Sequence, residues 1–67
     1  MPGDPVSWLL IEPGWTVVDA YGKSVGKVDE VLGDQLVDIF HGLTVDGTEI
    51  LAERIGEIRE GEVRLLA

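Results

Sequence analysis

The sequence predicts an all-β protein, a small barrel or sandwich of about six short strands with one helical turn. Three observations support this fold class. Nine valines and five isoleucines among 67 residues favour extended backbone. Turn signals that contain glycine recur about every eight to ten residues between the β-prone segments. Only one short stretch spaces its apolar residues at the period of a helix.

The start of the chain predicts a flexible arm followed by one domain. Two prolines and a glycine fall within residues 1–5, which favours a loose or extended segment, and residues 6–67 suffice for one small domain. Val6–Ile11 is β-prone and is expected to form a short strand. The Pro13-Gly14 pair should end this strand, because proline cannot donate to a strand ladder.

The next two segments predict a hairpin. Trp15–Ala20 is rich in β-branched residues and is expected to be a strand. A turn follows, in which Gly22 supplies the positive φ that a tight hairpin needs. Ser24–Leu32 is then the second strand of this hairpin.

The second strand has a rival interpretation as an amphipathic helix, because Val25, Val28 and Val31 are spaced by three. The β-branched side chains, the preceding turn and a glycine inside the segment favour the strand. Its broken alternation then requires a bulge or bend, for which Gly26 is the natural site. A Gly26→Val change should therefore destabilise the fold by more than the ~1 kcal/mol typical of a point substitution.

The longest strand is expected over Leu36–Val45. Alternation would place five of its side chains on one apolar face, namely Val37, Ile39, His41, Leu43 and Val45. His41 would lie on that face or at its rim, where a structural role is favoured over a chemical one. Phe40, Gly42 and Thr44 would lie on the other face.

The last third of the chain predicts two hairpins joined by a helical turn. Asp46-Gly47 is the strongest short hairpin signal in the sequence, and Thr48–Ala52 should be the strand that follows it. A single helical or 3-10 turn is expected at Ala52–Ile55, which Gly56 could end.

Two short strands should then flank a turn at Glu60-Gly61, with Ile58, Val63 and Leu65 pointing inward. Five glycines of the chain are assigned to turns or bends rather than to a phosphate-binding loop. They are Gly14, Gly22, Gly26, Gly47 and Gly61.

The charge of the chain disfavours polyanionic partners. The net charge is −8, and the five basic residues are scattered among thirteen acidic ones. Nucleic acids and anionic membrane surfaces both require clustered Lys and Arg, so neither is expected as a partner. No apolar run approaches the length of a bilayer span, and the first residues lack the basic region of a signal peptide. We therefore expect a cytoplasmic protein that does not insert into a membrane.

No catalytic, cofactor-binding or metal-binding residue is assigned. The chain has no cysteine, and His41, its single histidine, has no neighbouring residue in a catalytic or ligand spacing. The densest acidic group is Asp29, Glu30, Asp34 and Asp38. It could bind calcium, but it lacks the alternating oxygen ligands of a calcium loop. A solvated strand edge is the favoured interpretation.

The candidate interaction surface is the apolar run of Trp8, Leu9, Leu10 and Ile11. A strand buried on one face hides only alternate side chains, so two of the four would face outward. A second copy of the chain is the simplest way to cover these outward-facing side chains. We therefore predict a homodimer whose interface includes Val6–Ile11. Trp8 and Trp15 leave two alternatives open: both lie in the core, or one is exposed at an interface.

Two parts of the sequence resemble PRC-barrel domains. The first part has the family's Gly-x-x-Val strand, Asp-x-x-Gly hairpin and (V/I)-G-K-V-x-(D/E)-V segment, here Gly14 with Val17, Asp19 to Gly22, and Val25 to Val31. The second part, "ILAERIGEI" and "IREGEVRLL", is similar to the family's final strands. The likeness covers Ile11 to Leu66. Ala52 departs from it, because the family usually has proline there, and the Val45–Thr48 connection is short, as in a minimal stand-alone member.

The resemblance implies an SH3-like β-barrel that acts as a non-enzymatic interaction or adaptor module. Its partners would be an unidentified protein and a second copy of the chain. Two alternatives remain: a purely structural barrel that only assembles with itself, and a small-ligand-binding or metal-binding subunit of an enzyme.

Overall fold

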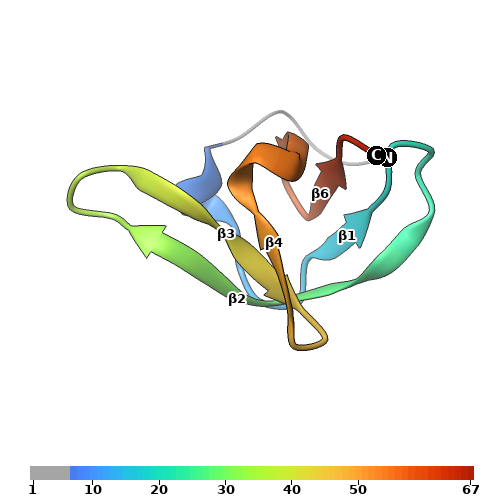
Figure 1. Ribbon diagram of the computed structural model, residues 1–67, viewed down its shortest axis with the longest axis horizontal. Helices are drawn as coiled ribbons and strands as arrows, with labels where there is room; N and C mark the ends of the chain where they lie inside the picture. The colour runs from blue at the N-terminus through green and yellow to red at the C-terminus, as the bar shows by residue number, and fades with distance from the viewer. Residues whose placement is uncertain (1–6) are drawn as a thin grey trace.

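The computed structural model describes residues 7–67, so the expected arm over residues 1–5 and Val6 lie outside the described residues. The chain folds into one curled sheet of six strands in the order β4-β3-β2-β1-β6-β5 (Figure 1). The strands are β1 (Thr16–Val18), β2 (Ser24–Asp34), β3 (Ile39–Val45), β4 (Thr48–Leu51), β5 (Ile55–Arg59) and β6 (Glu62–Leu65). The sheet curls into a half-barrel, which confirms the prediction of a small, barrel-like all-β fold.

β2 joins the two halves of the half-barrel. Its first residues pair with β1 and its later residues pair with β3, so both halves of the sheet share it. The strand interpretation of Ser24–Leu32 is confirmed, the helix alternative is wrong, and the strand continues to Asp34.

The expected bend lies at Gly26, which has φ +145 and pairs with Val17 beside a register shift. A Cβ at this glycine would lie 2.5 Å from Cγ1 of Val45 across the curl of the sheet. Both the positive φ and the close approach therefore require glycine at this position.

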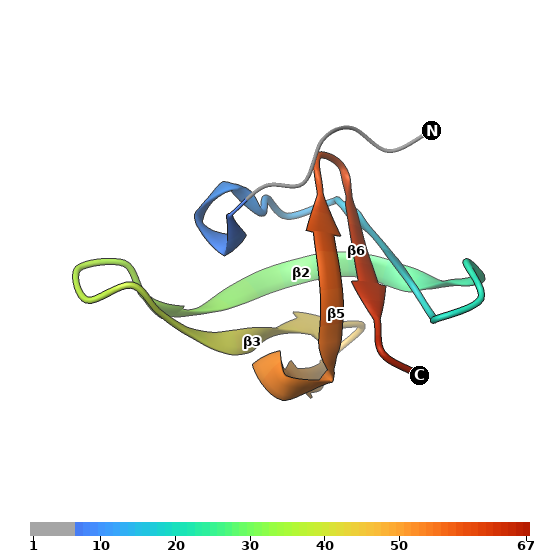
Figure 2. The same cartoon turned by 90° about the horizontal axis from the view of Figure 1, so that it is seen from above.

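The longest strand is β2, not the predicted Leu36–Val45, because residues 35–38 form the turn of the β2–β3 hairpin. The Asp34 carboxylate accepts a hydrogen bond from the backbone N–H of Leu36 at 2.9 Å, and Asp38 has φ 54. Such side-chain bonds hold Asx-type turns and compete with strand pairing. The hairpin projects sideways from the rest of the sheet, as Figures 1 and 2 both show.

The predicted single face of β3 is also wrong. The register changes from Leu32 opposite Gly42 to Gly33 opposite Phe40, so His41 is an extra residue at a bulge. One extra residue reverses the alternation. Phe40 therefore packs against the core, while Ile39 and His41 are exposed; Leu43 and Val45 remain buried as expected.

The later hairpins follow the sequence signals. Asp46 and Gly47 have φ of 51 and 79, the two positive values of a type I′ turn, and join β3 to β4. A 3-10 turn, η2 (Ala52–Arg54), leads into β5. Gly56 lies inside β5 and does not end this turn.

The core draws buried side chains from every strand except β5, whose isoleucines are partly buried against it. Its buried members are Ile11, Val17, Val28, Leu43, Val45, Ile50, Val63 and Leu65. Both tryptophans and Ile58 are partly buried against this cluster. With no disulfide available, this packing carries the stability of the described residues.

Candidate interaction surface

The expected strand over Val6–Ile11 is wrong for its described residues. Trp8–Leu10 forms a second 3-10 turn, η1, in addition to the one predicted. The Ser7 hydroxyl accepts a hydrogen bond from the N–H of Leu9 at 3.2 Å, and the N–H of Ile11 bonds to the carbonyl of Trp8 at 3.1 Å. Local capping of this kind competes with strand pairing, and it turns the apolar run on itself.

Trp8 fixes η1 against the β2–β3 hairpin. Its ring is stacked on Phe40 with the centroids 5.1 Å apart and the planes at 16°. Its indole Nε1 donates a hydrogen bond to Oδ1 of Asp38 at 2.8 Å. Gly33 leaves space for the indole, because a Cβ there would lie 2.9 Å from Cη2 of Trp8. The indole is thus held by a ring, a carboxylate and a glycine of one hairpin.

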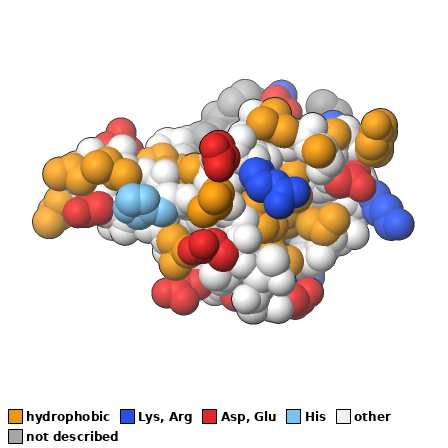
Figure 3. Space-filling view, in the orientation of Figure 1, with side chains coloured by type: hydrophobic (Ala, Val, Ile, Leu, Met, Phe, Trp, Pro, Cys, Tyr) orange, Lys and Arg blue, Asp and Glu red, His pale blue; other side chains and the backbone are white. Residues whose placement is uncertain are grey.

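Exposed aliphatic side chains surround this anchored turn. Leu36 is 96% exposed at the tip of the hairpin, and Val37 is 60% exposed beside it. Leu9, Leu10 and Ile39 are each about half exposed. These five side chains are called the hairpin end. Figure 3 shows hydrophobic side chains gathered at the outer end of the hairpin, beside acidic ones. A group of large apolar side chains on a well-anchored element is typical of an interaction surface.

The four predicted surface residues divide between core and surface. Ile11 is buried, Trp8 is half-buried, and the exposed pair is Leu9 and Leu10 rather than alternate residues of a strand. Trp15 is also half-buried, so neither tryptophan is fully exposed.

Sequence reasoning missed the hairpin-tip residues Leu36, Val37 and Ile39 as surface residues. The signal was present, because the polar residues Asp34 and Gln35 precede them and mark a turn.

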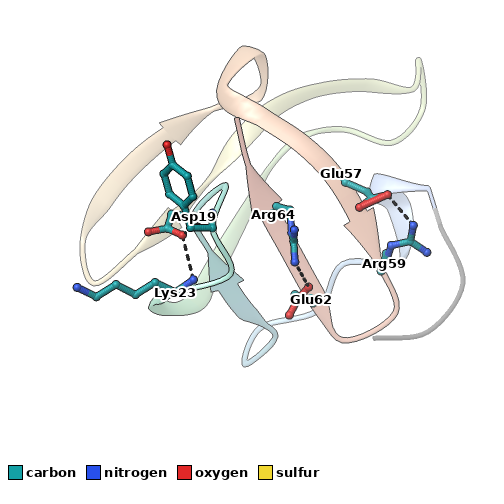
Figure 4. Close-up of polar contacts among 7 residues, drawn as sticks. Asp19, Lys23, Glu57, Arg59, Glu62 and Arg64 are labelled. Carbon is teal, nitrogen blue, oxygen red and sulfur yellow. Dashed lines mark hydrogen bonds and ion pairs between the residues drawn. The ribbon is translucent and has the colours of Figure 1, made fainter. Parts of the chain in front are cut away.

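Tyr21 is a further large exposed hydrophobic side chain, and it lies apart from this group. Tyr21 lies in the β1–β2 turn, at the opposite end of the molecule from the hairpin tip (Figure 1). The Asp19 carboxylate holds that turn by accepting hydrogen bonds from two backbone N–H groups. The donors are Tyr21 at 2.8 Å and Lys23 at 2.9 Å (Figure 4). Single exposed apolar residues of this kind are normal on a protein surface.

The basic residues Arg59 and Arg64 form ion pairs with glutamates of β5 and β6. Glu57 lies opposite Arg64 and Arg59 lies opposite Glu62, so the four charges alternate across the two strands (Figure 4). Arg59 donates to Glu57 at 2.7 Å, and Arg64 lies 4.0 Å from Glu62. The hydrogen bond from Arg59 lowers the pKa of the Glu57 carboxyl below its ordinary value. Alternation of this kind stabilises paired strands.

Three of the four carboxylates in the predicted acidic group accept hydrogen bonds, two from backbone N–H groups and one from the indole of Trp8. Asp34 and Asp38 hold the hairpin turn and the indole of Trp8, and Asp29 accepts a hydrogen bond from the N–H of Gly47 at 3.2 Å. Glu30 is exposed. Within residues 7–67, no three His, Asp or Glu side chains gather in an arrangement that could hold a metal ion.

No helix among the described residues is long and apolar enough to cross a membrane.

His41 and Ser24 are exposed on their strands, and Ser7 caps η1. The five glycines assigned to turns and bends all have positive φ, from 79 to 145.

No family model matches this sequence, and no curated protein matches it.

Proposed function

We propose that this chain is a non-enzymatic protein-interaction module of PRC-barrel type, and that the hairpin end is its contact surface. The observation that carries the proposal is the anchoring of η1 by Trp8 to a projecting hairpin whose tip exposes Leu36 and Val37. An apolar surface that is held rigid before binding loses little conformational entropy when a partner covers it.

The first partner that we propose is a second copy of the chain. Two hairpin ends related by a two-fold axis would cover each other's leucines, and such isologous contacts are the commonest in soluble oligomers. Burying one fully exposed leucine contributes about 1.5–3 kcal/mol. Each copy carries a net charge of −8, so repulsion between the copies opposes this gain. The proposed homodimer is therefore a weak one.

A second protein is the other proposed partner, which would use the same surface when it is free of the homodimer. In this role the chain is an adaptor, and exchange between the two partners follows from the weakness of self-association. The proposal also includes the cytoplasmic location expected from the sequence.

Light scattering on size-fractionated protein over a dilution series tests the proposal. A Leu36→Ser, Val37→Ser double variant should shift the dimer to monomer, because it removes apolar side chains from the proposed interface. Both side chains are exposed and do not support the core, so the fold should be retained. Tyr21→Ser is the matched control, since Tyr21 is 93% exposed at the other end of the molecule. The mass of one chain at every concentration up to the millimolar range would refute self-association.

A further inference from the structure

The outer edge of β4 is a free strand edge among the described strands, because β4 is the terminal strand of the sheet. Val45 and Thr48 flank the two-residue turn and form a hydrogen-bonded pair, so the next pair, Thr44 and Glu49, is a non-bonded one. The N–H and C=O of Glu49 therefore point away from β3, toward the open edge. They are a donor and an acceptor ready for another strand.

A cavity of about 320 Å³ lies beside this edge. Its apolar walls are Val25, Val45, Ile50 and Leu65, which come from β2, β3, β4 and β6. This volume is at the lower end of the ~300–1,000 Å³ range of ligand pockets. An apolar cavity of this size beside free backbone groups fits an aliphatic side chain of an added strand.

The rim of the cavity carries charges of both signs. Asp46 lies at the turn that begins β4, Glu49 lies within the strand, and Arg54 lies in η2 after its end. Arg54 forms no ion pair with any residue in the described part of the chain. In the face seen in Figure 3, hydrophobic side chains surround a basic side chain near the middle, with acidic side chains on one side.

We propose that this groove binds an extended segment of a partner protein, which adds to β4 as an antiparallel strand. One of its aliphatic side chains enters the cavity, while its backbone bonds to the N–H and C=O of Glu49. A basic residue toward its C-terminal end pairs with Asp46 and Glu49, and an acidic residue toward its N-terminal end pairs with Arg54. Main-chain bonds supply affinity in this mode, and the cavity and charges supply specificity. This site is separate from the hairpin end and does not depend on it.

The peptide acetyl-Glu-Thr-Val-Leu-Val-Thr-Lys-amide is the probe, titrated into the isotope-labelled full chain while amide NMR shifts are followed. We expect saturable shifts at Glu49, Ile50 and Leu65, with the amides of Leu36 and Val37 unchanged. A peptide with its Glu and Lys exchanged should bind about tenfold more weakly. No saturable shift at millimolar peptide, or shifts centred on the hairpin end, would overturn the proposal.

A pair of variants separates backbone addition from simple side-chain contact. Glu49→Pro removes the outward N–H, so it should weaken binding about tenfold, whereas Glu49→Ala should change it about twofold. The same peptide N-methylated at its central leucine lacks the backbone N–H that would donate to the carbonyl of Glu49. It should also bind about tenfold more weakly, and this comparison leaves the protein unaltered. Equal binding of the N-methylated and unmodified peptides would overturn the proposed strand addition, whether or not Glu49→Pro folds.

Discussion

The indole Nε1 of Trp8 donates a hydrogen bond to Oδ1 of Asp38 at 2.8 Å, across a sequence separation of 30 residues. Asp38 is the last residue of the hairpin turn and has a positive φ, and the residue two positions later, Phe40, stacks on the same indole. One side chain of η1 thus contacts both the turn and the strand that follows it. The orientation of the projecting hairpin is therefore tied to the short segment before β1.

The contribution of this hydrogen bond can be measured with Trp8→Phe. Phenylalanine retains an aromatic ring for Phe40 but has no N–H for Asp38, so we expect a loss of about 1 kcal/mol in the free energy of unfolding. Trp8→Ala also loses the stacked ring and its burial, and it should cost about 2–3 kcal/mol. Urea unfolding followed by far-ultraviolet circular dichroism measures both. Equal losses in the two variants would show that the stacking contributes nothing.

The bend in β2 predicts a difference between two glycine substitutions. Gly26→Ala meets Val45 and a positive φ together, so its cost should clearly exceed about 1 kcal/mol. Gly14→Ala is the matched control, because Gly14 also has positive φ but no atom within 4 Å of a Cβ, and it should cost only about 1 kcal/mol. Thermal unfolding of the two variants compares them. A Gly14 variant that is as unstable as the Gly26 variant would contradict the close approach.

The pairing of β3 and β4 predicts opposite responses to proline at adjacent residues. The N–H of Thr48 bonds to Val45 across the turn, so Thr48→Pro should destabilise by about 3 kcal/mol or unfold the chain. The N–H of Glu49 faces the open edge, so Glu49→Pro should cost less than about 1 kcal/mol. Melting temperatures report the difference. If Glu49→Pro were the more damaging of the two, the assigned bonding pattern of this hairpin would be wrong.

The Glu57 carboxyl provides a prediction about pH. Its folded-state pKa is lowered, first by the hydrogen bond from Arg59, so any stability that it adds is present above its unfolded pKa and is lost as the pH falls through the folded value. In Arg59→Gln the pKa of Glu57 should rise toward its ordinary value. A carbon-13 NMR titration of the carboxyl groups over the acidic range measures this. An unchanged titration of Glu57 would show that the hydrogen bond is not formed in solution.

The strands and turns that local chemistry determines were predictable from the sequence. Asp46-Gly47 and Gly22 have the positive φ values that their turn signals predict. The β-branched residues within the predicted strand Trp15–Ala20 form β1, which is shorter than predicted and covers Thr16–Val18. The bend at Gly26 was predictable because a glycine that interrupts the alternation of a strand is typical of a bulge.

The features that the sequence predicted wrongly depend on long-range contacts, which a local sequence pattern does not contain. Alternation alone could not reveal the extra residue at His41, because a bulge is set by pairing with β2. The position of the Trp8 side chain depends on Asp38 and Phe40, which are some thirty residues away, in addition to the local cap by Ser7. Of the four residues predicted for the interaction surface, Leu9 and Leu10 are exposed. The exposed hairpin tip beside them could be located only from the fold.

The central claim, that the hairpin end is where two copies meet, can be tested by paramagnetic broadening between copies. The chain has no cysteine, so Gln35→Cys gives one unique attachment site for a spin label at the hairpin tip. Spin-labelled protein is mixed with isotope-labelled protein that carries no spin label. We predict broadening of the amides of Leu36, Val37, Ile39, Leu9 and Leu10 in the isotope-labelled copy, with Tyr21 and Lys23 unaffected. Hairpin-end signals that stay sharp at millimolar concentration, or broadening centred on the Tyr21 turn, would contradict the account.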